Sequence, residues 1–361
     1  LADAAFYVRP GSALFEEALS RGTTCYFPSF SIPMLPPSLS EGVVSLNPDV
    51  ERRALTFIME MDDKGAVHSY RIVRSRIRSR AQLTYNGVQR YYDDPASSGL
   101  AGNDYTMVLD LLKVVGEIRM ESARMENRVH FNREEPLVHC TRDGSGFHIT
   151  LEERNECSLY NEQISLMCNM TGGMFLADGD DSQVHGIFRI HQSPDDKSLE
   201  ELNRDLEEIL DSHDIDDPAM KWNRESETLA DYMDRLYTAF EGKRLMEALE
   251  RRVLMTMRRS MFTSTAGEHY ALAVDTYSRF SSPMREVVGI FIHKEALGKL
   301  GLEEHTNPED DILLREKVID AGNAAKSRQN RIEKEIVKAA ADRLFSSQLS
   351  TDEGDRPRYP A

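Results

Sequence analysis

Several features that define large classes of protein are missing from this sequence. No stretch approaches the roughly 18 consecutive apolar residues that a membrane-spanning helix requires. The first residues contain neither the basic nor the apolar segment of a secretion signal. The cysteines are few and form no CxxC pair, so neither a zinc ribbon nor a disulfide framework is indicated; they are Cys25, Cys140, Cys157 and Cys168. We therefore expect a cytoplasmic protein that has no membrane partner.

The short motifs of common enzyme classes are absent as well. The sequence contains no GxGxxG fingerprint, no Walker loop, no HExxH pair and no GxSxG elbow. Its 10 histidines show no short ligand spacing, which argues against a zinc site. These absences exclude the commonest classes of nucleotide-binding protein, metalloprotease and serine hydrolase. We also expect no small-molecule cofactor.

Positive charge is also scarce. Lysine and arginine total 44 against 61 aspartates and glutamates, which gives a formal net charge of −17. A protein that binds duplex DNA without sequence preference needs a broad basic face, so this balance argues against that function. It is compatible with a nuclease whose basic residues are confined to one channel. Hydrophobic residues make up 40% of the chain, enough to bury a sizeable core.

What the sequence does contain is the pattern of an α+β protein with a helical second half. Apolar and polar residues alternate on either side of a turn at residues 62–65, which predicts a β-hairpin over residues 53–80. A short strand is expected at Ala4–Val8, and apolar residues recur at helical spacing through much of the chain. The expected helices span residues 13–21, 105–128, 158–172, 198–212, 225–237, 240–256, 282–299 and 308–345.

The chain shows no internal repeat and no linker of low complexity. We therefore expect residues 1–345 to form a single domain, with a mixed or antiparallel sheet surrounded by helices. Residues 346–361 are polar and contain prolines, and we expect them to be a disordered tail.

Several segments carry a resemblance to one family. Residues 2–14 read ADAAFYVRPGSAL, residues 21–36 read RGTTCYFPSFSIPMLP, residues 70–79 read YRIVRSRIRS, residues 188–194 read FRIHQSP and residues 277–285 read YSRFSSPMR. Together they resemble the RNB catalytic domain that ribonuclease II, ribonuclease R and the eukaryotic exosome nuclease share, over nearly the whole chain. The resemblance implies a hydrolytic 3′-to-5′ exoribonuclease that releases nucleoside 5′-monophosphates from single-stranded RNA.

The resemblance also implies how such RNA is held. An enzyme without sequence preference must grip the bases by their faces and the backbone by its charge. Tyr26 matches the aromatic residue that stacks on the 3′-terminal bases, and Phe131 matches its partner across the stack; from the pattern alone, Phe131 would be a core aromatic. Tyr85 and Glu162 match residues at the ribose 2′-hydroxyl. Gln163 stands where the family has a second glutamate, so we expect sugar discrimination to be altered.

Residues for the phosphate are implied in the same way. Arg285, together with Ser282 in the same motif, matches the family's substrate-binding arginine, at the N-terminal turn of the helix expected from residue 282. A guanidinium and free amides at such a turn can hold a phosphate. Glu286 replaces the next arginine of the family pattern and Gly289 replaces its aspartate. These replacements imply a re-formed phosphate pocket.

The metal site is the part of the family pattern that this sequence does not supply. By the resemblance, hydrolysis uses Mg²⁺ held by an aspartate cluster that precedes the segment matching Asp3, and Asp3 itself is expected to be structural. Arg285 and Glu333, which matches an acidic residue near the family's active site, are the catalytic residues expected here. The strand-like start predicts that an N-terminal part is missing. Two alternatives stay open: an inactive RNA-binding or regulatory scaffold of the same fold, and an acidic helical interaction protein.

Overall fold

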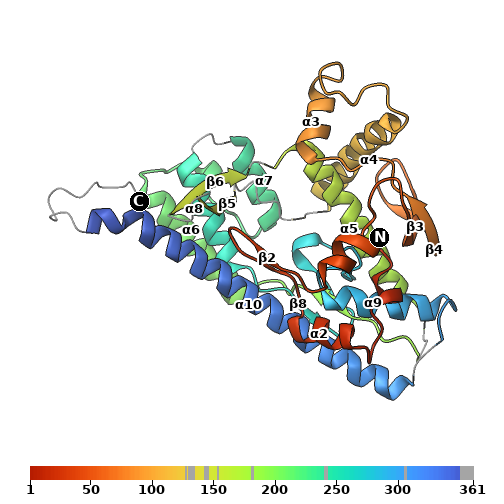
Figure 1. The fold of residues 1–361 in the computed structure, drawn as a ribbon. Helices are drawn as coiled ribbons and strands as arrows, with labels where there is room; N and C mark the ends of the chain where they lie inside the picture. The colour runs from red at the N-terminus through yellow and green to blue at the C-terminus, as the bar shows by residue number, and fades with distance from the viewer. Residues whose placement is uncertain are drawn as a thin grey trace.

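The computed structural model describes residues 1–126, 128, 135–141, 146–152, 154–179, 183–239, 243–304 and 307–349. Over these residues the chain forms an α+β fold with a largely helical second half, as the sequence predicted (Figure 1). The helices are α1 (Ala4–Tyr7), α2 (Ala13–Arg21), α3 (Tyr85–Asp93), α4 (Thr106–Met125), α5 (Glu156–Ala177), α6 (Asp196–Ser212), α7 (Leu229–Ala239), α8 (Lys243–Thr256), α9 (Val287–Lys299) and α10 (Pro308–Leu349). Short helical turns of other geometry occur at Ser38–Val43, Pro218–Met220 and Tyr270–Leu272. Among the described helices, none combines the length and the apolar character that crossing a bilayer requires.

The strands pair antiparallel and form separate two-stranded ladders. They are β1 (Cys25–Tyr26), β2 (Ser31–Ile32), β3 (Glu51–Met61), β4 (Val67–Arg78), β5 (Glu135–Cys140), β6 (Phe147–Glu152), β7 (Phe188–Ile190) and β8 (Met261–Thr263). In three ladders the two strands are close in the sequence, whereas β7 and β8 come from distant parts of the chain. The ladder β7–β8 therefore depends on the packing of the helices between its strands.

The long hairpin β3–β4 confirms the prediction made from alternating residues. Its turn is closed by Asp62, whose Oδ1 accepts hydrogen bonds from the backbone N–H of Lys64 at 3.0 Å and of Ala66 at 2.8 Å. Gly65 adopts a φ of 87°, which a residue without Cβ takes at little cost. Leu55 on β3 and Ile72 on β4 are buried on the same face of the hairpin, which is therefore the face that points to the core.

Two hydrophobic cores support the molecule. The larger one joins the first two helices, the hairpin, α9 and part of α10. The second lies among α6, α7 and α8 and is formed by Leu202, Leu206, Leu210, Met220, Trp222, Leu229, Tyr232, Met233, Leu236, Leu245, Met246, Leu249 and Val253. The leucines of α6 recur every four residues, so the amphipathic pattern read from the sequence gives the buried face directly.

The last helix, α10, runs along one side of the molecule and contacts elements from both ends of the chain (Figure 1). It begins at Pro308 and carries acidic residues in its first turn, where both are favoured. Asp311 in that turn forms an ion pair with Lys294 of α9 at 2.6 Å. The helix continues to Leu349, beyond the predicted end at residue 345, and residues 350–361 of the expected disordered tail lie outside the described residues.

Two local predictions were wrong. Ala4–Tyr7 forms a single helical turn instead of a strand, because Ala4 and Ala5 are buried in the core while Asp3 just before them is anchored to Arg74. The Oδ2 atom of Asp3 lies 2.8 Å from Nε of Arg74, and Asp3 is 1% exposed, which agrees with the structural role expected for it. Tertiary packing of this kind overrides local strand preference.

The helix predicted from residue 282 begins instead at Val287. Glu286, the residue before it, has an extended backbone with φ −135° and ψ 126°. The reason is that Glu286 bridges to Thr23 as a strand residue would. The segment before α9 is therefore held by the start of the chain, and Arg285 lies in this segment and not in the first turn of the helix.

Gly172 on α5 gives a test of the packing in the larger core. A Cβ added at Gly172 would lie 2.2 Å from Cδ2 of Phe280, which is fully buried. We expect Gly172→Ala to lower the free energy of unfolding by about 1–3 kcal/mol, measured by urea denaturation, because the ring must shift to make room. Gly42 has nothing within 4 Å of the same added atom, so Gly42→Ala should leave the urea midpoint nearly unchanged. Equal midpoints for both variants would contradict this account of the packing.

Candidate functional site

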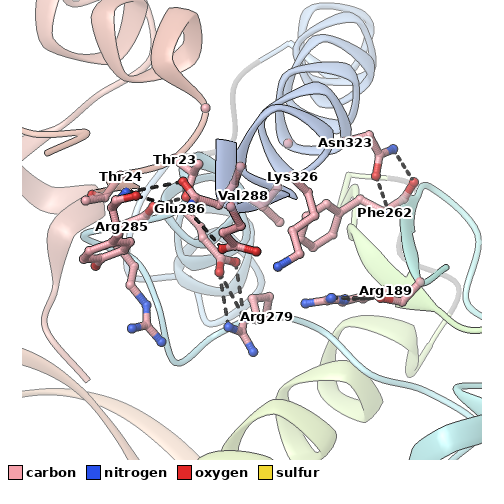
Figure 2. Close-up of a pocket in the computed structure, with 16 residues that line it drawn as sticks. Thr23, Thr24, Arg189, Phe262, Arg279, Arg285, Glu286, Val288, Asn323 and Lys326 are labelled. Carbon is pink, nitrogen blue, oxygen red and sulfur yellow. Dashed lines mark hydrogen bonds and ion pairs between the residues drawn. The ribbon is translucent and has the colours of Figure 1, made fainter. Parts of the chain in front are cut away.

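A pocket of about 260 Å³ lies where the start of the chain meets α10 and the segment before α9 (Figure 2). It is lined by Gly22, Thr23, Thr24, Tyr26, Arg189, Ser260, Phe262, Arg279, Arg285, Glu286, Val288, Gly322, Asn323, Lys326, Gln329 and Glu333. Three residues predicted from the sequence, Tyr26, Arg285 and Glu333, therefore line the same cavity. We call this cavity the inner pocket.

Backbone pairing brings Tyr26 next to Arg285. The N–H of Thr24 donates to the carbonyl oxygen of Arg285 at 3.0 Å, and the N–H of Val287 donates to the carbonyl oxygen of Gly22 at 3.0 Å. The hydroxyl of Thr23 donates to the Arg285 carbonyl as well, at 2.8 Å. These contacts hold residues 22–26 against the segment before α9.

Gly22 is required at the point where this loop meets α10. It has a φ of 70°, and a Cβ there would lie 2.7 Å from the carbonyl oxygen of Ala321 and 2.7 Å from Cβ of Ala325. Both the left-handed backbone and the close approach exclude a larger residue. The glycine at this position is thus explained by contact with the last helix.

Gln329 of α10 positions two of the predicted site residues. Its Oε1 accepts from the N–H of Tyr26 at 3.3 Å, and its Nε2 donates to the carbonyl oxygen of Tyr26 at 3.4 Å. The same Nε2 donates to Oε1 of Glu333 at 3.0 Å. Tyr26 remains 51% exposed, so its backbone is fixed while the residue is still accessible to a ligand.

The inner pocket gathers positive charge in a chain that is acidic as a whole. Arg279 forms an ion pair with Glu286 at 3.2 Å. Burial opposes the charge of Arg279, but Glu286 and Tyr277 outweigh it and raise the pKa of this guanidinium above its ordinary value. Arg189 donates from Nε and Nη2 to the hydroxyl of Ser260 at 3.0 and 2.8 Å. Burial, and then the charge of Arg279, lower the pKa of Arg189.

A second cavity, which we call the outer pocket, adjoins the first. It has a volume of about 650 Å³ and is lined by Thr84, Tyr85, Asn86, Arg154, Asn155, Ser158, Asn161, Glu162, Ser165, Leu166, Asn169, Tyr277, Arg279, Ser281 and Arg285. Arg279 and Arg285 line both pockets and form the wall between them. Tyr85 and Glu162, predicted together from the sequence, both lie here.

The polar side chains of the outer pocket are already oriented. The hydroxyl of Tyr85 accepts from Nδ2 of Asn161 at 3.0 Å, and Glu162 forms an ion pair with Arg154. The Tyr85 ring is 52% exposed. The pocket therefore offers hydroxyl, amide and carboxylate groups to a polar ligand.

The remaining predicted residues have other positions. Ser282 is buried, and its hydroxyl accepts from Nε of Arg285 at 3.1 Å, so it orients that guanidinium. Gln163 is 5% exposed and lines neither pocket, and its Oε1 has no hydrogen-bond partner. Phe131 lies outside the described residues.

Three cationic residues of the inner pocket were missed by the sequence reasoning. Arg189 and Arg279 both lie inside segments that resemble the family pattern. Neither segment indicates that Arg279 pairs with Glu286, seven residues later in the chain. Lys326 gave no signal, because it is one of several exposed lysines on α10.

The described residues do not fit a Mg²⁺ site. In the part of the chain that the structure describes, no group of three or more histidine, cysteine, aspartate or glutamate side chains is placed to hold a metal ion. Glu286 is paired with Arg279, and Glu333 accepts from Gln329. The described lining of the inner pocket therefore offers cationic and hydrogen-bonding side chains.

Two buried histidines support the strand that carries Arg189. The rings of His191 and His269 lie 5.2 Å apart, and the Nδ1 atom of His269 is buried without a hydrogen-bond partner. Burial lowers the pKa of His269 to about 4, with smaller contributions from His191 and Arg189. His269 is therefore neutral in the folded protein at pH 7.

Comparison with known proteins agrees with this geometry. The model of the RNB domain family matches residues 1–295. Ribonuclease R 2 of Lactococcus lactis is 27% identical over 360 residues, which cover 92% of this chain and 51% of that protein. The chain spans about half the length, or less, of the curated relatives it matches.

Solved structures show the same fold at low identity. Mycoplasma genitalium RNase R in complex with ribose methylated single-stranded RNA matches with a TM-score of 0.83 at 20% identity, over 96% of this chain and 53% of that one. Yeast Ssd1, described as a pseudonuclease, matches with a TM-score of 0.68 at 13% identity, over 96% of this chain and 41% of that one. Both similarities concern the fold.

The neutral state of His269 predicts a specific loss of stability in acid. The unfolded chain takes up this proton near pH 6.5 and the folded chain only near pH 4, so stability falls as the pH drops between these values. From pH 7 to pH 5 this histidine should account for about 2 kcal/mol of the lost free energy of unfolding. His269→Gln should make the difference between urea unfolding at pH 7 and at pH 5 smaller, whereas His68→Gln, at an exposed position, should not. An unchanged difference in His269→Gln would show that this histidine does not bear the effect.

Proposed function

This chain belongs to the RNB domain family, and from that premise we propose that the protein is a 3′-to-5′ exoribonuclease that hydrolyses single-stranded RNA to nucleoside 5′-monophosphates. The curated relatives named ribonuclease R support this activity, as does the structural neighbour from Mycoplasma genitalium, which was solved with single-stranded RNA. The two pockets described above are the proposed binding site for the RNA end.

One observation carries the proposal. Tyr26 and Arg285 line the same pocket, with an exposed aromatic face and an exposed guanidinium whose positions are fixed by backbone contacts. A ring stacks on any base, and a guanidinium binds any phosphate in a forked geometry. Such a pair holds RNA regardless of its sequence, which is what an exonuclease of broad specificity needs.

The outer pocket suits the sugar and the backbone that follow the terminal nucleotide. Tyr85 and Glu162 present a hydroxyl and a carboxylate, the groups that hydrogen-bond a ribose 2′-hydroxyl. Arg279 and Arg285, which line both cavities, mark a path for the phosphates from one pocket to the other. Gln163 lies outside this path, so Glu162 is the acidic residue that we propose for the sugar contact.

The proposal for Mg²⁺ rests on the family resemblance alone. Hydrolysis of a phosphodiester by a metal-dependent nuclease requires acidic side chains gathered around the ions. The described residues do not provide such a cluster. Their part in the reaction is therefore to bind the RNA end and to fix its orientation.

An inactive RNA-binding scaffold is the second candidate. The missing metal cluster in the described residues favours it, and so does the likeness to Ssd1, a pseudonuclease. The test is to incubate the intact gene product with Mg²⁺ and single-stranded RNA labelled at its 5′ end. Stepwise shortening from the 3′ end supports the exonuclease, binding without shortening supports the scaffold, and no binding at low salt contradicts both.

Two substitutions test the grip on RNA. Tyr26→Leu should weaken binding of a short single-stranded RNA by about 1–3 kcal/mol, because a stacked base loses its aromatic partner. Arg285→Gln should also weaken binding and reduce the salt dependence of the affinity by about one phosphate contact. Both effects can be measured by fluorescence anisotropy at several salt concentrations.

Arg76→Gln is the matched control for the loss of one arginine. Arg76 is a surface residue of β4 with a side chain that is 73% exposed, and it lines neither pocket. Its substitution should leave both the affinity and the salt slope close to those of the unaltered protein. If Arg285→Gln behaved like Arg76→Gln, the phosphate role of Arg285 would be refuted.

A further inference from the structure

We propose that the inner pocket binds a phosphomonoester through Arg189, Arg279 and Lys326, and that it recognises RNA ending in a 3′-phosphate in preference to RNA ending in a 3′-hydroxyl. This inference rests on the proposed function for the RNA end. It adds a ligand class, assigns a role to Arg189 and Lys326, and gives Arg279 a second role.

The first argument is the balance of charge. Four cationic side chains line the inner pocket, Arg189, Arg279, Arg285 and Lys326, against the two carboxylates of Glu286 and Glu333. Arg279 alone among the four is paired with a carboxylate within the described residues. The pocket therefore holds an excess of positive charge that an anionic ligand can neutralise.

The second argument is the orientation of the donors. Arg189 lines the pocket and uses Nε and Nη2 on Ser260, so its Nη1 is not needed for that contact. Figure 2 shows the Lys326 ammonium and the Arg189 guanidinium pointing into the same space, with Arg279 beside them. The donors come from β7, from the segment before α9 and from α10, so they converge from separate elements.

The third argument is that the pocket places the guanidinium groups of Arg189 and Arg279 close together. Burial lowers the pKa of Arg189 most, and the charge of Arg279 lowers it further, while Glu286 opposes this shift. The two guanidinium groups therefore repel each other. Asn323 fixes one side of the pocket, because it binds both the N–H and the carbonyl of Phe262, at 2.9 and 3.0 Å. An anion bound between the cations reduces their repulsion.

The chemistry favours a monoester over a diester. A phosphomonoester carries a charge of about −1.5 to −2 at pH 7 and three oxygens that accept hydrogen bonds, whereas an internal phosphodiester carries one charge. A diester must also let the chain continue on both sides. A terminal phosphate can lie in the inner pocket while the rest of the RNA leaves along Arg285 through the outer pocket.

The experiment compares two RNA oligonucleotides of one sequence, one ending in a 3′-hydroxyl and one in a 3′-phosphate, without added metal. We expect the full chain to bind the 3′-phosphate form about tenfold more tightly, as one added charge-assisted contact would give. Lys326→Gln should bring the ratio of the two affinities close to one. Lys326 is at the surface, so this substitution is compatible with folding, which circular dichroism would verify.

Lys317→Gln is the matched control, because Lys317 is an exposed lysine of the same helix that does not line the pocket. It should keep the ratio of the unaltered protein. Equal affinities for the two RNAs in the unaltered protein, or a preference that survives Lys326→Gln, would overturn the inference while leaving the proposed function intact. Failure to bind either RNA would contradict the proposed function itself.

A titration with inorganic phosphate identifies the source of the monoester. If millimolar inorganic phosphate weakens the binding of the 3′-phosphate RNA but not that of the 3′-hydroxyl RNA, it removes the preference by competition. The site then recognises phosphate on an RNA end, and the inference is supported. If inorganic phosphate binds as tightly as the 3′-phosphate RNA does, the site serves free phosphate, and the stated preference for an RNA end is refuted.

Discussion

The hydrogen bonds between residues 22–24 and residues 285–287 are the constraint on which the site depends. They join the start of the chain to the segment before α9, and each contributes only about 0.5–1.5 kcal/mol. The arrangement is stable because buried residues on both sides, among them Ala18 and Val287, belong to the same hydrophobic core. Weak directional contacts therefore set the geometry, and the burial of apolar surface supplies the energy.

The distribution of charge follows from this architecture. The chain carries a formal net charge of −17, yet its inner pocket is lined by more cations than carboxylates. A negative surface disfavours a polyanion everywhere except where local positive charge overcomes it. The acidic composition is consistent with the RNA binding that we propose, because it restricts this binding to one part of the molecule.

Sequence patterns predicted the elements that local chemistry determines. The hairpin followed from alternation and from a turn closed by Asp62, and most helices followed from apolar periodicity. The predictions for Ala4–Tyr7 and for the start of α9 were wrong. Contacts with Arg74 and Thr23, which are remote in the sequence, decide both structures. No local pattern contains that information.

The residues of the candidate site also divide into those that the sequence indicated and those that it did not. Tyr26, Arg285 and Glu333 were named from a resemblance and line one pocket. The pair Arg279 and Glu286 was not named, since two opposite charges seven residues apart in a loop do not reveal that they meet. Lys326 was missed for a similar reason, and Gln163, which was named, is buried away from both pockets.

The wall shared by the two pockets has a thermodynamic consequence. Arg279 and Arg285 line both cavities, so anions bound in the two cavities interact with the same two guanidinium groups. If an anion in one pocket changes the affinity of the other pocket by some factor, an anion in the second pocket changes the affinity of the first by the same factor. A single strand that spans both cavities avoids this mutual antagonism, because its own covalent spacing sets how its charges are distributed across the two arginines.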